Sequence, residues 1–122
     1  MRIMFLGYHG DMAVINIESD NQKVIKSVID SICGGYTGFD TNVMSTPDLK
    51  YRYVYNDGID VKYDYDFAKN KCMDKLYDLK EYFDCVIFKG VPYTNDVQNL
   101  TDEDIEYLFR LYGDINESKE NR

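Results

Sequence analysis

The spacing of hydrophobic residues changes several times along the 122-residue chain, and each change marks an expected element. Two compact apolar runs, at residues 2–8 and 12–17, flank a glycine-containing segment, and this arrangement predicts a β-hairpin. Helical spacing follows, so we expect a helix that Ser19 or Asp20 caps and that the pair Gly34-Gly35 ends. The apolar face of this helix consists of Val24, Ile25, Val28, Ile29 and Ile32.

The most regular alternation of aromatic and polar residues lies between positions 51 and 66. It turns at Asn56-Asp57-Gly58, which predicts a second β-hairpin with strands at residues 51–55 and 59–63. The preceding segment, residues 38–47, lacks such a period and is expected to form a loop or an irregular edge.

Three further elements are expected in the second half of the chain. Asp64 or Asp66 can cap a helix whose apolar residues recur at steps of four, three and four: Cys72, Leu76, Leu79 and Phe83. The continuous apolar run at residues 85–88 predicts a buried strand. The acidic segment 101–104 resembles a helix start, and Gly113 is expected to end that helix. Its apolar face consists of Ile105, Leu108, Phe109 and Tyr112.

These elements predict one α+β domain over residues 1–113, followed by a polar tail at residues 114–122. We expect a mixed or mainly antiparallel sheet of about four or five strands with three helices packed on it. The expected core comprises Ile3, Phe5, Val14, Val28, Ile32, Leu76, Leu79, Val86, Phe88, Leu108 and Phe109.

Composition narrows the range of partners. The formal net charge is −8, and a binder of nucleic acid or of an anionic membrane needs a basic surface, so neither is an expected direct partner. The three cysteines are widely spaced and form no Cys-x-x-Cys motif, which fits a reducing cytoplasm. The apolar run at the start of the chain is too short for a signal peptide, and no stretch reaches the length of a membrane span. A cytoplasmic protein is therefore expected.

No set of residues matches a catalytic or metal-binding motif, so we expect no enzyme activity, no cofactor and no metal. His9 lies in a glycine-flanked turn, and no motif places a serine or cysteine nucleophile near it. A zinc site stays open as an alternative if the fold gathers four residues that are distant in sequence: His9, Cys33, Cys72 and Cys85. The glycine clusters lack the lysine and the spacing of phosphate-binding loops.

The remaining candidates for function are surface residues. Tyrosine supplies a large contact area at low entropic cost, and carboxylates supply a polar rim, so both suit a protein-binding surface. The candidate partner-binding residues are Tyr51, Tyr53, Tyr55, Asp57, Asp60, Asp64, Asp66, Asp102, Glu103, Asp104 and Glu106. Burial in the core is the alternative for each hairpin tyrosine, because a two-stranded ribbon needs one buried face. The alternation does not tell which face is inward.

In overall composition the chain resembles small phage-encoded anti-defence proteins, in particular anti-CRISPR inhibitors. The resemblance rests on small size, strong acidity, the amino-acid usage of an AT-rich genome and the lack of a catalytic motif. It implies a non-catalytic protein that acts in the host cytoplasm and inhibits a host nucleic-acid-processing enzyme, such as a CRISPR nuclease, by binding a basic surface. Lysines interrupt the acidic runs, which favours a protein-surface inhibitor over a strict mimic of DNA. The alternatives are a small-molecule or nucleotide-binding sponge of a mobile element and a structural or assembly protein.

Overall fold

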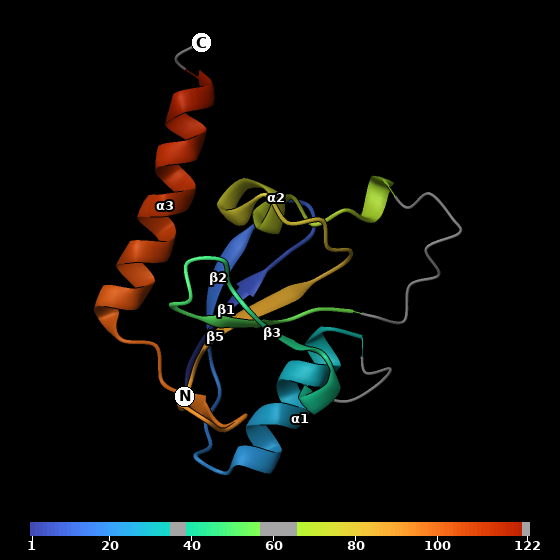
Figure 1. Cartoon of the computed structure of the whole chain (residues 1–122), viewed down its shortest axis with the longest axis vertical. Coiled ribbons are helices and arrows are strands. Elements are labelled where there is room, and N and C mark those ends of the chain that lie inside the picture. Colours follow the sequence, from blue (N-terminus) through green and yellow to red (C-terminus); the bar gives the residue numbers. More distant parts are fainter. Residues whose placement is uncertain (35–38, 57–65, 121–122) are drawn as a thin grey trace.

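The computed structural model describes residues 1–34, 39–56 and 66–120, which form a sheet covered by three helices (Figure 1). The elements are β1 (Arg2–Leu6), β2 (Met12–Asn16), α1 (Gln22–Ile32), the 3-10 turn η1 (Phe39–Thr41), β3 (Val43–Ser45), β4 (Arg52–Val54), the 3-10 turn η2 (Asp66–Ala68), α2 (Lys71–Tyr77), β5 (Cys85–Gly90), β6 (Val97–Gln98) and α3 (Asp102–Glu120). The strand order is β2-β1-β5-β4-β3, β6 pairs with the end of β5, and every pair is antiparallel. The predicted α+β class is confirmed.

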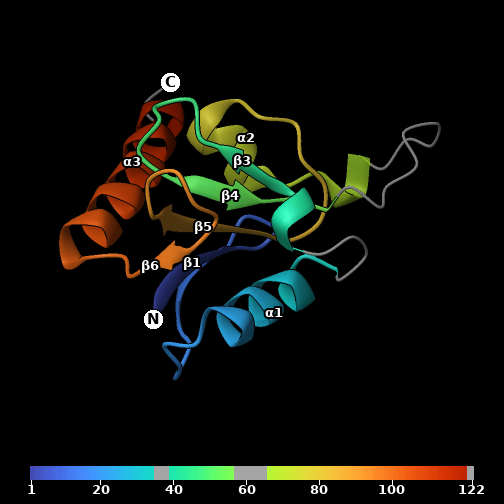
Figure 2. The same cartoon turned by 60° about the horizontal axis from the view of Figure 1, so that its bottom comes forward.

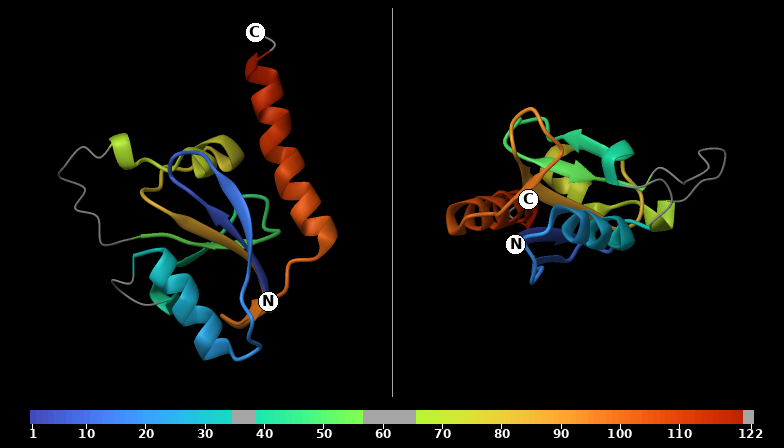
Figure 3. Two further views of the ribbon diagram at one scale, coloured as in Figure 1. Left: turned by 180° about the vertical axis from the view of Figure 1, so that it is seen from behind. Right: turned by 90° about the horizontal axis from the view of Figure 1, so that it is seen from below.

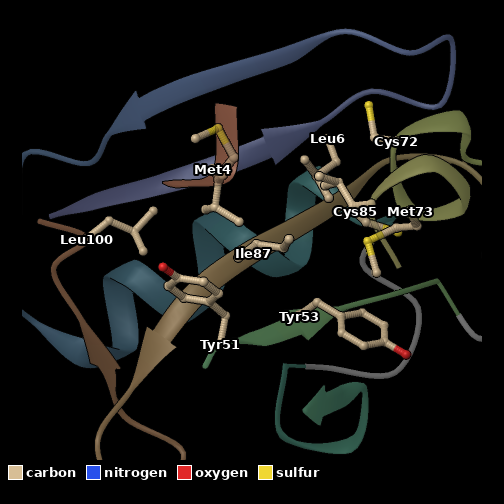
Figure 4. Packing of buried hydrophobic residues seen from close by; sticks show 11 residues of the cluster. Met4, Leu6, Tyr51, Tyr53, Cys72, Met73, Cys85, Ile87 and Leu100 are labelled. Carbon is tan, nitrogen blue, oxygen red and sulfur yellow. The ribbon is translucent and has the colours of Figure 1, made fainter. Parts of the chain in front are cut away.

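The sheet separates two hydrophobic clusters, one on each face. Helix α1 covers one face, and helices α2 and α3 cover the other (Figure 2). Successive side chains of a strand point to opposite faces, so Ile3 of β1 packs on the α1 side while Met4 and Leu6 pack on the other side. Figure 4 shows this second cluster, in which Ile87 of the central strand β5 lies among residues of β1, β4 and α2.

The first hairpin and the central strand agree with the sequence prediction. Strands β1 and β2 pair in register with Phe5 opposite Ala13, and residues 85–88 are fully buried in β5. Helix α1 ends before Gly34, whose φ of +104° is a conformation that glycine adopts without steric cost. The last predicted helix also starts as expected: its acidic start is predicted at residues 101–104, and α3 begins at Asp102.

The helix caps differ from those predicted for α1 and α2. Asn21, rather than Ser19 or Asp20, caps α1 by accepting a hydrogen bond from the N–H of Lys23 (2.9 Å). Asn70 caps α2 by accepting from the N–H of Met73 (2.9 Å), so neither predicted aspartate, Asp64 or Asp66, has this role.

Asn70 could not be chosen over its neighbours from the sequence, because its role depends on distant backbone. Its side chain is fully buried, and its Nδ2 donates to the carbonyls of Leu6 (3.0 Å) and Phe83 (2.7 Å). One side chain therefore starts α2 and ties this helix to the end of β1.

Helix α2 is shorter than predicted and α3 is longer. Asp78 adopts a left-handed conformation with φ of +56°, which ends α2 at Tyr77, so the expected continuation to Phe83 is wrong. Helix α3 passes through Gly113 and reaches Glu120, so most of the predicted tail is helical. A Cβ added at Gly113 would meet no atom within 4 Å, and nothing in the surroundings requires the chain to turn there.

The second predicted hairpin is replaced by a different strand pairing. Residues 43–45, expected in a loop or an irregular edge, form the edge strand β3, and β4 lies between β3 and β5. The expected partner strand at residues 59–63 lies outside the described residues. Alternation within residues 51–55 predicted a strand, but it carried no information on which segments pair with it.

Two residues of the expected core are exposed. Val14 is 38% exposed because β2 is an edge strand, and Phe109 is 41% exposed because it lies beside the stripe of α3 that faces the sheet. Four others are only half-buried: Phe5, Val28, Ile32 and Leu79. The other five are buried: Ile3, Leu76, Val86, Phe88 and Leu108.

Candidate functional site

Three tyrosines and two aspartates form a hydrogen-bonded cluster between the β3–β4 turn, α2 and α3. We call it the tyrosine–carboxylate cluster, and its members are Asp48, Tyr51, Tyr77, Asp104 and Tyr107. The hydroxyls of Tyr77 and Tyr107 donate to the same oxygen of Asp48, at 3.0 and 3.2 Å. The hydroxyl of Tyr51 donates to Asp104 (3.0 Å), and the rings of Tyr51 and Tyr107 lie 6.1 Å apart. The cluster thereby joins elements far apart in the sequence.

Asp48 is held in its ionised form by its neighbours. Burial alone raises the pKa of this carboxyl, but hydrogen bonds from Thr46, from the Lys50 backbone and from the two tyrosines outweigh burial and lower the pKa. The Lys50 ammonium also lies 3.9 Å from the centre of the Tyr107 ring, a cation–π contact. Burial and the neighbouring carboxylate raise the pKa of Tyr77, so this phenol remains a hydrogen-bond donor.

Asp104 has the same character although it lies among exposed acids. Its side chain is 15% exposed, and it accepts from the N–H and hydroxyl of Thr101, both at 2.9 Å. The hydroxyl of Thr101 in turn accepts from the Asp104 N–H (3.1 Å), which makes a capping box at the start of α3. Burial raises the pKa of Asp104, but the bonds from Thr101 and Tyr51 and the charge of Lys89 lower it below its ordinary value.

The predicted tyrosine surface is largely part of the core. Tyr51 and Tyr53 are each 4% exposed, and Figure 4 shows both among the buried residues of the α2–α3 side. The Tyr53 hydroxyl donates to Glu81 (3.2 Å), and this bond lowers the pKa of Glu81. Burial has the larger effect, so the pKa of Glu81 is raised overall. Tyr55 is half-buried, with its ring 6.2 Å from that of Tyr53. Burial, the alternative for the hairpin tyrosines, therefore applies to Tyr51 and Tyr53.

The predicted acidic residues divide between the outside and the inside of the protein. Asp57, Asp60 and Asp64 lie outside the described residues, and the backbone of Asp66 lies in η2. At the start of α3, Asp102 and Glu106 have side chains that are 94% and 70% exposed, and Glu103 is also exposed. Asp104, between them in sequence, points into the tyrosine–carboxylate cluster instead.

The fold adds two acids that sequence reasoning did not select. Asp102 pairs with Arg2 (2.6 Å). Arg2 lies opposite Asn16 in the sheet, and Asn16 comes just before the loop that holds Glu18 and Asp20. Five exposed carboxylates thus lie toward one end of the molecule, and we call this set the acidic rim: Glu18, Asp20, Asp102, Glu103 and Glu106. Sequence distance hid this grouping, because only the pairing of β1 with β2 creates it.

An open cleft lies between the free edge of β3 and the β5–β6 turn. Its volume is about 540 Å³, and its lining includes Arg52, Met44, and Tyr93. The Arg52 guanidinium donates to the carbonyls of Thr94 and Val91, and no carboxylate of the described residues pairs with it. Tyr93 is fully exposed and has a left-handed φ of +64°. The cleft therefore offers a cation beside an accessible aromatic ring.

The three cysteines are buried, and among the described residues they and His9 do not gather into the zinc site that the sequence left open. All three are free thiols. Burial raises the pKa of Cys33 to about 12 and of Cys72 to about 11, and it raises the pKa of Cys85 strongly. His9 is exposed beside Tyr8, with ring centres 4.1 Å apart. Within residues 1–34, 39–56 and 66–120, no group of three metal-binding side chains is close enough to hold an ion.

Known proteins give no further guide to function. No protein-family model matches the chain, and neither the curated proteins nor the solved structures contain a significant match. Among the described helices, none combines the length and the apolar composition that crossing a bilayer requires.

Proposed function

We propose that this protein is a non-catalytic binding protein whose acidic rim contacts a basic surface of a host nucleic-acid-processing enzyme and inhibits it. The observation that carries the proposal is the exposure of the rim carboxylates in a chain of net charge −8. Glu103 has no ion-pair partner among the described residues, and Asp102 and Glu106 meet only arginines of the surface. The charge of Glu103 is therefore available to a partner, whereas Asp102 and Glu106 would exchange an arginine of this chain for a base of the partner.

The attraction between the acidic rim and a basic groove is electrostatic. An acidic surface attracts a positively charged groove over several ångströms and speeds the encounter, and added salt screens this attraction. The composition of the chain, which resembles that of anti-CRISPR inhibitors, makes a CRISPR nuclease the first partner to test. Exposed apolar residues such as Phe109, next to the rim on α3, can supply desolvated contact area.

The test is a charge reversal on the rim. Tagged protein is used to capture partners from a host lysate, and a recovered nuclease is purified for binding and activity measurements. We expect Glu103→Lys/Glu106→Lys to reduce the association rate at least tenfold and to weaken inhibition. The binding of the parent protein should fall as salt rises from about 50 to 200 mM, by the screening described above.

The matched control is Asp40→Lys/Asp74→Lys. It changes the net charge equally at exposed carboxylates of η1 and α2, outside the rim. Circular dichroism checks that both variants are folded. The proposal is wrong if no nucleic-acid-processing protein is recovered, or if the rim variant inhibits as well as the control.

A second candidate function has its own observation, the cleft beside Arg52. A guanidinium without a carboxylate partner suits an anionic group, and the exposed Tyr93 ring suits stacking with a base, so the cleft is the candidate site for a nucleotide. Thermal denaturation with a panel of mono- and dinucleotides tests this function. Specific binding would raise Tm for the parent and not for Arg52→Gln. No shift with any nucleotide excludes it.

A further inference from the structure

The two edges of the sheet differ in length and in chemistry. Strand β3 has three residues, whereas β2 has five, Met12–Asn16, and none of the five is charged. Proteins commonly protect a sheet edge with charged residues, proline, a bulge or a covering element. Strand β2 pairs in continuous register with β1 only, and no described helix crosses in front of it in the view from behind (Figure 3). This edge is therefore open.

The hydrogen-bond pattern shows which backbone groups face the open side. Gly7 donates to the Asp11 carbonyl and Ile17 donates to the Met1 carbonyl, both at 2.8 Å. Bonded positions alternate in an antiparallel pair, so Ala13 and Ile15 also bond to β1. The N–H and C=O groups of Met12, Val14 and Asn16 then point outward. No backbone group of the described residues pairs with them.

The side chains of β2 add exposed apolar area to this edge. Val14 is 38% exposed on the face that carries α2 and α3, and Ala13 is exposed on the face that carries α1. An outward row of backbone donors and acceptors with apolar neighbours fits another β-strand. The geometry of the edge does not identify the strand that binds it, but the charge of the protein narrows the choice.

We propose that β2 pairs with β2 of a second copy of this chain, in antiparallel orientation about a two-fold axis. In this register Val14 lies opposite Val14 of the second copy, and the outward groups of Met12 meet those of Asn16. Ala13 then lies opposite Ile15, a small residue against a large one. The strand is therefore complementary to itself, as an isologous contact requires.

Charge favours this edge as the place where two copies meet. Two chains of net charge −8 repel each other, and β2 provides a contact row without any carboxylate. One end of β2 leads to the exposed acids Glu18 and Asp20, and the other end lies beside Lys71, whose N–H donates to the Tyr8 carbonyl. Antiparallel pairing brings the acidic end of one copy to the Lys71 end of the other. The carboxylate at that end, Asp11, lies against Gly7.

The proposal does not depend on the acidic rim and is tested on the protein alone. Sedimentation velocity over about 1–200 μM should show conversion from a 14.3 kDa monomer to a species of twice that mass. Val14→Pro removes an outward N–H and no bond to β1, a position where an edge strand tolerates proline. Val14→Lys places two like charges opposite each other. We expect each to weaken dimerisation at least tenfold.

Ser27→Lys is the matched control, because it adds the same charge at an exposed position of α1. Salt separates this contact from partner binding, since screening should strengthen self-association between like-charged copies and weaken a contact of opposite charges. Two results overturn the proposal: a parent protein that stays monomeric at 200 μM (the top of the range), or dimers of Val14→Lys as stable as those of Ser27→Lys. Val14→Lys keeps the test decisive if the proline variant does not fold.

Discussion

The tyrosine–carboxylate cluster and the acidic rim both contain carboxylates, but the surroundings of these carboxylates differ. Asp104 and Glu103 are neighbours in sequence, yet Asp104 accepts bonds from Thr101 and Tyr51, whereas Glu103 faces solvent. In the cluster the carboxylates accept hydrogen bonds that connect the β3–β4 turn, α2 and α3. In the rim they are exposed to solvent, and two of them, Asp102 and Glu106, pair with arginines. A count of acidic residues does not distinguish these two uses, but burial and partners do.

Removing Asp48 should have the largest effect on stability. Asp48→Ala leaves the hydroxyls of Tyr77 and Tyr107 without their shared acceptor, and an unsatisfied donor costs about 1–3 kcal/mol when fully buried, so these two part-buried hydroxyls should each cost toward the lower end of that range. We expect the free energy of unfolding to fall by roughly 2–3 kcal/mol in urea denaturation. Adding Tyr77→Phe and Tyr107→Phe to the Asp48 variant should recover part of this loss. A strictly additive set of variants would show that the cluster is not coupled.

Removing one hydroxyl of the same cluster should have a smaller effect. Tyr51→Phe keeps the packed ring and loses only the bond to the ionised Asp104, and a bond to a charged group is worth about 1.5 kcal/mol at the lower end of its range. Asp104 retains its two bonds from Thr101, so the helix cap survives. Thermal unfolding should show a Tm lower by roughly 3–8 °C. A larger fall would mean that the hydroxyl orders more than this pair.

Strong acid should weaken the tyrosine–carboxylate cluster by protonating Asp48. The folded-state pKa of Asp48 is below its ordinary value of 3.8, so its stabilisation is complete above that value and is lost as pH falls through the lower folded pKa. Asp48→Asn should therefore flatten the decline of stability below about pH 4, where the unfolded group titrates.

The pH dependence of stability that Glu81 contributes has the opposite sign to that of Asp48, which makes Glu81 a useful comparison. Its folded pKa is above the ordinary 4.5, so its contribution is present below that value and is lost as pH rises through the folded pKa. Glu81→Gln should remove that loss. Urea titrations from pH 2 to 7 measure both slopes, and equal changes in the two variants would contradict the assignment.

Neutralising the rim should change stability least. Glu103→Gln/Glu106→Gln loses a favourable interaction with the helix dipole and one exposed pair with Arg110, each worth about 0.3–0.5 kcal/mol. We expect a total change under about 1 kcal/mol. If the loss of stability were as large as that of Asp48→Ala, the rim residues would have a structural role. The reason to regard the rim as a binding surface would then be removed.

Local patterns predicted the elements better than they predicted the neighbours of each element. Alternation and helical spacing located β1, β2, β5 and the three helices, because these periods reflect which side of an element is buried. The cap Asn70 was missed because its role depends on backbone that is remote in sequence. The cap Asn21 is local, since it accepts from Lys23, and it was missed because Ser19 and Asp20 are equally suitable capping residues beside it. Strand β3 was missed because its segment lacks a regular period.

The candidate site was predictable in residue type and not in placement. The exposed acids at the start of α3 were found from composition and capping signals. Tyr51 and Tyr53 point inward because α2 and α3 cover that face of β4. Glu18 and Asp20 join the rim because β1 pairs with β2. Neither fact has a local signal.

The burial of the three cysteines gives the protein a built-in reporter of its own opening. A thiol reacts as the thiolate, and both burial and the raised pKa values of Cys33 and Cys72 suppress that form in the folded protein at neutral pH. Cys33 follows α1, Cys72 lies in α2 and Cys85 begins the central strand. Alkylation by a small reagent, read by mass spectrometry for each cysteine, therefore measures how often each of these regions exposes its interior.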